Sequence, residues 1–217
     1  MCSLSISLAF VANPEPDNFT IQGAQQVHIQ ISILSINSWI VISQRVDGSM
    51  SFNRSWSDYK TGFGIFDNAS SNFWLGNEKV HQITRRDEHR LRIEFRFKDT
   101  GGWYSAEYES FSIDDEDDGY MLHLDGFSGD VGDALTLSAD GGADGMKFST
   151  PDADNDKSSS SCAKQYRSGW WMNKCYSVNL NGIYSSGIYW DTVNVNGKVF
   201  PGGTITELRM MVSKRDN

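Results

Sequence analysis

The segment Asp152–Cys175 constrains this chain more than any other, because it combines an acidic triplet, two cysteines and a tryptophan pair. The aspartates at 152, 154 and 156 alternate with other residues, so a loop can direct several carboxylate oxygens toward one point. Ca²⁺ prefers such ligands, about six to eight oxygens in flexible geometry. The spacing therefore leaves two interpretations open, a calcium-binding loop and a solvated acidic turn.

The acidic triplet begins like an EF-hand loop but does not continue as one. Lys157 stands where the EF-hand needs a glycine for its sharp turn, and Ala163 stands where it needs a bidentate glutamate. An EF-hand is therefore excluded. An oxygen cage of another kind remains, in which backbone carbonyls of the following serines complete the ligand set.

Two cysteines stand close together in the same segment. A disulfide bridge that closes a loop of about 15 residues is worth about 3 kcal/mol in the chain-entropy model. Cys162 and Cys175 allow such a bridge, and two buried free thiols in a cytosolic protein are the alternative. A bridge beside a calcium loop would indicate an oxidising, extracellular setting. Cys2 is left over, and would be removed with a signal peptide, pair between chains or stay reactive.

Length, charge and apolar content limit the class of protein. The 217 residues suit one domain, or one domain with an appendage, and 7 Trp, 8 Tyr and 12 Phe supply material for a core. The net charge of −9 argues against nucleic acid as a partner, because phosphate neutralisation needs a basic face. No apolar run reaches the roughly 18 residues of a membrane span.

Export is indicated by weak but independent signals. Residues 1–12 contain the apolar run LSISLAFVA without a preceding basic residue, which makes a weak signal peptide. Three sequons, at Asn18, Asn53 and Asn68, predict N-glycosylation. We interpret the chain as part of a secreted protein.

Hydrophobic periodicity predicts an α+β chain with few long elements. An irregular N-terminal segment is expected over 1–37 and the main domain over 38–213. Asn77 is expected to cap one of the helices. The expected strands are 27–36, 39–45, 90–98, 104–113 and 120–124, the expected helices are 51–62 and 77–83, a solvated acidic hairpin tip is expected at 114–118, and little regular structure is expected over 126–203.

The loop-rich second half needs other sources of stability. Every ordered residue costs about 1–2 kcal/mol of backbone entropy, and a segment with few ladder hydrogen bonds recovers little of it. A bound Ca²⁺ and a disulfide would offset part of that cost. We therefore expect calcium, if bound, to be structural first.

Ordered sequence blocks carry a family resemblance. FSTPDADND, SCAKQY, SGWWMNKC and NLNGIY in this order, together with the upstream WIVISQRVDGS and NFWLGNEKVHQIT, resemble the fibrinogen C-terminal domain of fibrinogen chains, ficolins, tachylectins, tenascins and angiopoietins. The resemblance extends from about Ser38 to about Val212. It implies a fibrinogen C-terminal-like fold, with a mixed, mostly antiparallel sheet, short helices and a loop-rich calcium-binding C-terminal half.

The resemblance assigns residues to a calcium site and to a disulfide. The carboxylates of Asp154 and Asp156 and the backbone carbonyls of Ser158 and Ser160 would hold Ca²⁺, and Asp152 would orient this shell. The bridge between Cys162 and Cys175 would stand between the calcium loop and a ligand pocket.

Similar lectins place that pocket at a cis peptide before the second cysteine, here Lys174–Cys175. The backbone N–H groups beside it would donate to an acetamido oxygen. Tyr166 matches an aromatic wall residue of those lectins, and Tyr176 stands where they often carry histidine. Trp170 and Trp171 are expected to pack beneath the pocket.

This chain also departs from the family pattern. The loop after Tyr184 is shortened, so pocket-wall residues are missing, and Tyr184, Ser185 and Tyr189 are the candidates to replace them. Residues 20–38 lack the cysteine pair and the Cys-Asp-Met block with which the first subdomain normally begins. That subdomain is therefore expected to be incomplete.

Three functional hypotheses follow. A secreted, calcium-binding lectin for acetylated glycans is favoured, and an interaction module for extracellular protein ligands is the alternative. Catalysis is disfavoured, because no nucleophile elbow or zinc-ligand spacing surrounds the histidines at 28, 81, 89 and 123. The chain carries no collagen-like or heptad segment, so an oligomer would have to form by another route, for which Cys2 and the segment 13–37 are candidates.

Overall fold

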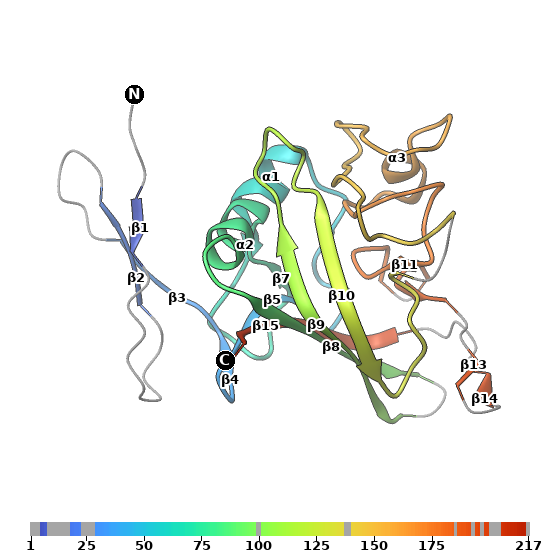
Figure 1. Ribbon diagram of the computed structural model, residues 1–217, viewed down its shortest axis with the longest axis horizontal. Coiled ribbons are helices and arrows are strands. Elements are labelled where there is room, and N and C mark those ends of the chain that lie inside the picture. Colours follow the sequence, from blue (N-terminus) through green and yellow to red (C-terminus); the bar gives the residue numbers. More distant parts are fainter. Residues whose placement is uncertain are drawn as a thin grey trace.

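The protein is organised around one large sheet (Figure 1). The computed structural model describes residues 5–7, 18–22, 29–98, 101–136, 140–184, 186–191, 194–195, 198–199 and 205–215. The sheet has the order β10-β9-β8-β15-β5-β7-β6, and β4 pairs with the start of β5. Its strands are β4 (Ser35–Ile36), β5 (Trp39–Arg45), β6 (Phe63–Gly64), β7 (Phe73–Trp74), β8 (His89–Phe97), β9 (Trp103–Ile113), β10 (Leu122–Gly129) and β15 (Ile205–Lys214).

The remaining elements are short. A separate three-stranded sheet and two two-stranded ribbons accompany the large sheet, and all strand pairs in the described residues are antiparallel. These elements are β1 (Ser5–Ser7), β2 (Asn18–Gln22), β3 (Ile29–Ser32), β11 (Val178–Asn179), β12 (Tyr189–Trp190), β13 (Asn194–Val195), β14 (Lys198–Val199), α1 (Trp56–Thr61), α2 (Asn77–Thr84) and α3 (Cys162–Tyr166). The fold is α+β, as the sequence predicts. No helix in the described ranges has the length and apolar character needed to cross a bilayer.

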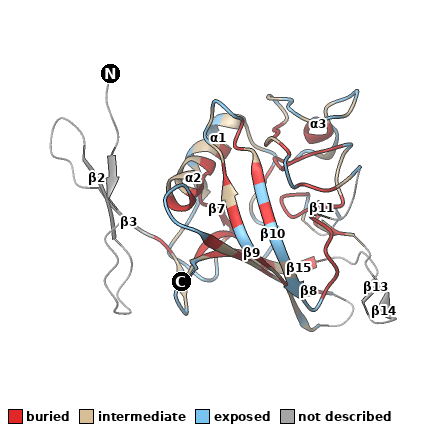
Figure 2. Ribbon diagram, in the orientation of Figure 1, coloured by how far each residue is buried: buried red, intermediate tan, exposed pale blue. Residues whose placement is uncertain are grey.

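Strand β8 shows how the sheet separates core from surface. Its side chains alternate strictly between buried and partly exposed positions, because successive residues of a strand point to opposite faces. The first half of β10 alternates in the same way (Figure 2). On the outer face, Glu94 pairs with Arg92 of its own strand and with Arg209 of the neighbouring strand β15. The alternation predicted over 90–98 is therefore confirmed.

The core lies between the sheet, helices α1 and α2, and the loop-rich second half. The rings of Trp74, Phe148 and Trp171 meet at its centre, with centroid separations of 5.9, 6.1 and 5.1 Å. Trp170 and Trp171 are each only 1% exposed. The packing role that the sequence predicted for this tryptophan pair is confirmed.

Helix α1 begins later than predicted. Ser55 Oγ accepts from the N–H of Asp58, and Asp58 Oδ2 accepts from the N–H of Ser55, so a reciprocal capping box starts the helix at Trp56. Phe52 therefore lies outside the helix, although it is buried and its carbonyl accepts from the Tyr59 hydroxyl at 2.7 Å.

The cap of helix α2 was predicted wrongly. Gly76, not Asn77, is the N-cap residue, and Asn77 Oδ1 instead accepts from Trp74 Nε1 at 3.1 Å. Gly76 has a φ of 113°, and a Cβ there would lie 2.8 Å from the backbone of Gly62. Only glycine fits this close backbone approach.

Other boundaries also differ from the expectations. The second hairpin strand is 122–129 rather than 120–124, because Tyr120 adopts a φ of 51° and is buried at the turn. The strand expected over 27–36 is divided into β3 and β4 around Ile33, which is buried, and Leu34, whose N–H donates to the Phe66 carbonyl. The segment 1–37 was expected to be irregular, but it contains β1–β4 and its Ile33 joins the core.

Candidate functional site

The acidic loop lies between the bridge that pairs Thr150 with Ala153 and helix α3. Asp156 organises it, because Oδ1 accepts from the N–H of Ser158 and Oδ2 accepts from the N–H of Cys162, both at 2.8 Å. The serine run is therefore folded back around one carboxylate. Asn155 anchors the loop to the core through a 2.8 Å bond from Nδ2 to the Phe148 carbonyl.

The carboxylates of Asp154 and Asp156 are neighbours. Burial raises the pKa of Asp156 above its ordinary value, and the charge of Asp154 raises it further, against the lowering by the two N–H donors. Neither carboxylate forms an ion pair within the described residues. Adjacent carboxylates that disfavour each other's charge are a suitable donor set for a hard cation.

Carbonyl oxygens would have to complete a metal site at this loop. In the described part of the chain, no three His, Cys, Asp or Glu side chains converge on one point. The backbone carbonyls of Ser158 and Ser160 accept no hydrogen bond from any described group. The donors named from the sequence are therefore oxygen ligands of the kind that Ca²⁺ takes.

Asp152 forms hydrogen bonds outside the pair of carboxylates at Asp154 and Asp156. Its Oδ1 accepts from the N–H of Trp56 at 2.9 Å and from the Thr150 hydroxyl at 2.7 Å. Trp56 is the first residue of α1, so Asp152 ties the acidic loop to that helix. This contact joins residues that are far apart in the sequence.

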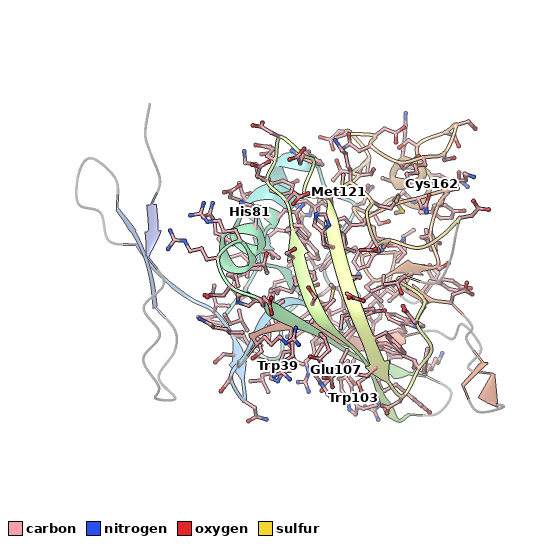
Figure 3. All side chains as sticks on the ribbon, viewed as in Figure 1. Trp39, His81, Trp103, Glu107, Met121 and Cys162 are labelled. Atoms are coloured by element: carbon pink, nitrogen blue, oxygen red, sulfur yellow. A yellow bond between two sulfur atoms is a disulfide. The ribbon has the colours of Figure 1, made fainter. Side chains whose placement is uncertain are left out.

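The predicted disulfide between Cys162 and Cys175 is confirmed, with a Cα–Cα distance of 5.4 Å. Cys162, labelled in Figure 3, is the first residue of α3, and its N–H is bound by Asp156. The peptide bond between Lys174 and Cys175 is cis. The acidic loop, the bridge and the cis peptide therefore form one continuous unit.

The segment 140–142 braces the cis peptide from the other side. The N–H of Lys174 donates to the Asp140 carbonyl at 2.9 Å, and the N–H of Ser177 donates to the Gly141 carbonyl at 2.8 Å. A Cβ on Gly141 would lie 2.3 Å from Ser177 Oγ, so this approach requires glycine. Between these two bonds, the N–H groups of Cys175 and Tyr176 donate to no described group.

Three tyrosines form a partly exposed cluster beside these amides. The ring centroids of Tyr166 and Tyr176 are 4.8 Å apart and edge to face, and those of Tyr176 and Tyr189 are 5.9 Å apart. The Tyr189 hydroxyl donates to Asp191 Oδ1 at 3.0 Å. Burial raises the pKa of both Tyr176 and Tyr189, so the phenols stay neutral donors at ordinary pH.

Tyr184 lies apart from this cluster. Its hydroxyl donates to the Thr206 carbonyl at 2.8 Å, and no ring contact joins it to the other tyrosines in the described residues. Of the wall candidates named from the sequence, Tyr189 is the one brought to Tyr176, and Ser185 lies outside the described residues. The bracing segment 140–142 was missed, because no local pattern indicates a contact with the cis peptide.

The other sequence-predicted residues are scattered. Asn53 and Asn68 are exposed, as acceptors of glycans must be, and Asn18 lies in β2. His81 contacts the Ile113 carbonyl and His89 the Asp87 carbonyl, each at 2.9 Å, while His123 pairs with Asp114. Cys2 and His28 lie outside the described residues. The described histidines are therefore distributed over separate structural contacts.

The geometry agrees with what sequence comparison finds. The family model for the C-terminal globular domain of fibrinogen beta and gamma chains matches residues 15–207. The chain belongs to this family. The match also begins before residue 38, so it includes β2 and β3.

Individual relatives are fibrinogen-like proteins. The chain is 43% identical over 157 residues to fibrinogen-like protein 1 of Bos taurus, which covers 70% of this chain and 50% of that protein. It is 36% identical to fibroleukin of Homo sapiens, covering 95% of this chain and 48% of that protein. The chain thus spans about half the length of these curated relatives.

Solved structures share the fold. A lamprey fibrin D-dimer complexed with the peptide Gly-His-Arg-Pro-amide superposes with a TM-score of 0.73 at 32% identity, covering 88% of this chain and 67% of that one. The fibrinogen-like globe domain of human ANGPTL6 gives a TM-score of 0.72 at 28% identity, covering 99% and 90%.

Proposed function

We propose that this domain is a calcium-binding recognition module of a secreted protein, and that it binds acetylated sugars at the cluster of Tyr166, Tyr176 and Tyr189. The observation that carries the proposal is the position of two N–H groups, those of Cys175 and Tyr176, which donate to no described residue and lie beside partly exposed aromatic rings. An acetamido group matches this arrangement, since its oxygen accepts hydrogen bonds while its methyl packs on rings.

Calcium is assigned a supporting role. Asp156 holds the N–H of Cys162, and Cys162 is bridged to Cys175, so a cation on Asp154 and Asp156 would fix the position of the recognition amides. Removing the cation would leave two neighbouring carboxylates in mutual repulsion. Ligand binding should therefore weaken when calcium is chelated.

A peptide ligand is the second candidate. The lamprey fibrin structure, 32% identical to this chain, holds the peptide Gly-His-Arg-Pro-amide. A peptide could use the same two N–H groups through its carbonyl oxygens. The disulfide and the exposed sequons at Asn53 and Asn68 suit an extracellular setting for either ligand.

The test is calorimetric titration of the oxidised, calcium-loaded chain with N-acetylglucosamine and, as a matched ligand, glucosamine. We expect binding of the acetylated sugar only, about tenfold or more weakened by Tyr166→Ala or Tyr176→Ala. Tyr184→Phe, a change at a tyrosine outside the cluster, should leave the affinity unchanged. Equal binding of both sugars, or unchanged binding by the Tyr166→Ala/Tyr176→Ala double variant, would refute the sugar assignment. Binding of Gly-His-Arg-Pro-amide in place of the sugar would favour the peptide.

A further inference from the structure

One hollow, whose lining includes none of the three clustered tyrosines, has an unusual charge distribution. It has a volume of about 520 Å³, within the range of small-molecule sites. The segment 48–53, the residue that ends α3 and the segment 181–184 enclose it. The residues that matter for its chemistry are Arg45, Ser49, Phe52, Arg167, Asn181 and Tyr184.

Arg45 forms the floor of the hollow and is 1% exposed. Its Nη1 donates to the carbonyls of Leu180 and Gly182 at 3.2 and 3.1 Å, and its guanidinium lies 3.8 Å from the centre of the Phe52 ring. Nε and Nη2 donate to no described group, and Nε is fully buried. Buried arginines are ordinarily paired with a carboxylate.

Arg45 forms no ion pair with any acidic side chain of the described residues. Asp47 is near enough to interact electrostatically, but its carboxylate is held by Ser49 and Asn72. Burial lowers the pKa of Arg45 to about 10, so the guanidinium remains charged at neutral pH. The floor of the hollow is therefore positive.

Arg167 supplies a second cation at the rim. It ends helix α3 in the left-handed conformation, with φ 54° and ψ 48°, and it is exposed. Its side chain makes no hydrogen bond or ion pair with any described residue. Two guanidinium groups that form no ion pair with a described residue thus line one hollow of a chain whose net charge is −9.

The other lining groups are polar and suit hydroxyl-bearing ligands. Asn181 donates from Nδ2 to the Gly169 carbonyl at 2.9 Å, while its Oδ1 has no partner in the described residues. Ser49 and Tyr184 also line the hollow. A ligand that combines one carboxylate with several hydroxyl groups suits the positive charge of the two arginines and the polar residues of this lining.

We propose that this hollow binds an acidic sugar, with Arg167 contacting its carboxylate and Arg45 stabilising the same charge from beneath. A charged guanidinium donates short, strong hydrogen bonds to a carboxylate, often in pairs. The hollow shares none of Tyr166, Tyr176 and Tyr189, so the proposal stands independently of the acetyl-sugar site. The ligand is the carbohydrate class with a carboxylate, such as a uronic acid.

The experiment is calorimetric titration of the oxidised, calcium-loaded full chain with sodium glucuronate and, as the matched neutral ligand, glucose. We expect glucuronate to bind and glucose not to bind. Arg167→Asn removes the guanidinium while asparagine tolerates the left-handed backbone, and should weaken glucuronate binding about tenfold. Lys164→Gln on the same helix removes one exposed charge that does not line the hollow, and should change the affinity less than twofold.

Several results would overturn the proposal. Equal binding of glucose and glucuronate would exclude a carboxylate site. If Arg167→Asn and Lys164→Gln lose the same affinity for glucuronate, the effect comes from the net charge of the protein and not from the hollow. If triglycine binds more tightly than glucuronate, and amidation of the triglycine abolishes that binding, the hollow recognises the C-terminal carboxylate of a peptide and not an acidic sugar. Arg45→Lys serves as a second variant, and if it folds, unchanged affinity in it would remove Arg45 from the site.

Discussion

Replacement of Asp156 by asparagine separates the two functions assigned to this carboxylate. Asp156 accepts two 2.8 Å bonds from backbone N–H groups, one through each oxygen. Asparagine has a single acceptor oxygen, so one bond to a charged acceptor is lost, at about 1.5–3 kcal/mol. Relief of the repulsion with Asp154 offsets part of this loss. In EDTA, we therefore expect a destabilisation of at most about 3 kcal/mol.

Calcium adds a second, concentration-dependent component. A ligand at about 100 times its Kd stabilises the native state by about 2.7 kcal/mol. For a domain of this size, each kcal/mol shifts Tm by about 2–4 °C, so saturating calcium should raise the wild-type Tm by about 5–11 °C. Asp156→Asn and Asp154→Asn should lose that rise.

Calorimetric scans with EDTA and with increasing calcium measure both components on oxidised protein. Asp125→Asn is a matched control, since Asp125 is an exposed aspartate of β10 away from the loop. Its calcium-induced shift should equal that of the wild type. The calcium assignment fails if wild-type Tm does not respond to millimolar calcium, or if Asp156→Asn responds equally.

The structure makes four further predictions. Because the pKa of Asp156 is raised in the folded protein, its contribution to stability without calcium is fully present below the ordinary pKa near 3.9 and is lost as pH rises through the folded pKa. Subtracting the pH–stability profile of Asp156→Asn from that of the wild type isolates this contribution. A difference profile that rises with pH would contradict the raised pKa. Tyr108→Phe removes a 2.9 Å bond to the buried Asp133 carboxylate and should cost about 1.5–3 kcal/mol in denaturant unfolding, and a loss below about 0.5 kcal/mol would show that the bond contributes nothing net. Ser55→Ala breaks the capping box of α1 and should cost about 1 kcal/mol by the same assay, whereas the exposed Ser57→Ala should be nearly neutral. Gly141→Ala forces a Cβ onto Ser177 and should abolish N-acetylglucosamine binding at a calcium concentration that saturates the acidic loop, while retained affinity would show that segment 140–142 does not position the amides.

Local sequence patterns predicted two central strands of the sheet. The expected 90–98 nearly coincides with β8, whose apolar residues alternate with charged ones because one face is buried. The expected 39–45 coincides with β5, a short apolar run that is buried on both faces from Ile40 to Arg45. Helix α1 was predicted too long, since Phe52 matches the apolar spacing although the Ser55–Asp58 capping box interrupts it. An aspartate in place of the more common glutamate made that box harder to recognise.

Long-range contacts could not be predicted in the same way. Asp152 binds Trp56, and Gly141 supports Ser177, through approaches that depend on how distant segments pack. Arg45 could be named from the sequence only as part of a strand, and only the three-dimensional structure shows that its buried Nε has no hydrogen-bond partner among the described residues. The sequence thus indicated which residues carry charged or polar groups, while the packing of distant segments determined which of these groups come into contact.

The position of β15 has a consequence for the order in which the protein can fold. This strand is the last described element to leave the ribosome, yet it lies between β5 and β8 and pairs with both. Until it arrives, the two halves of the large sheet present unpaired edges toward each other, and such edges invite pairing with other chains. Synthesis at about 5–20 residues per second makes this interval long compared with hairpin formation. A nascent chain of this protein is therefore expected to need protection from aggregation until residues 205–214 insert.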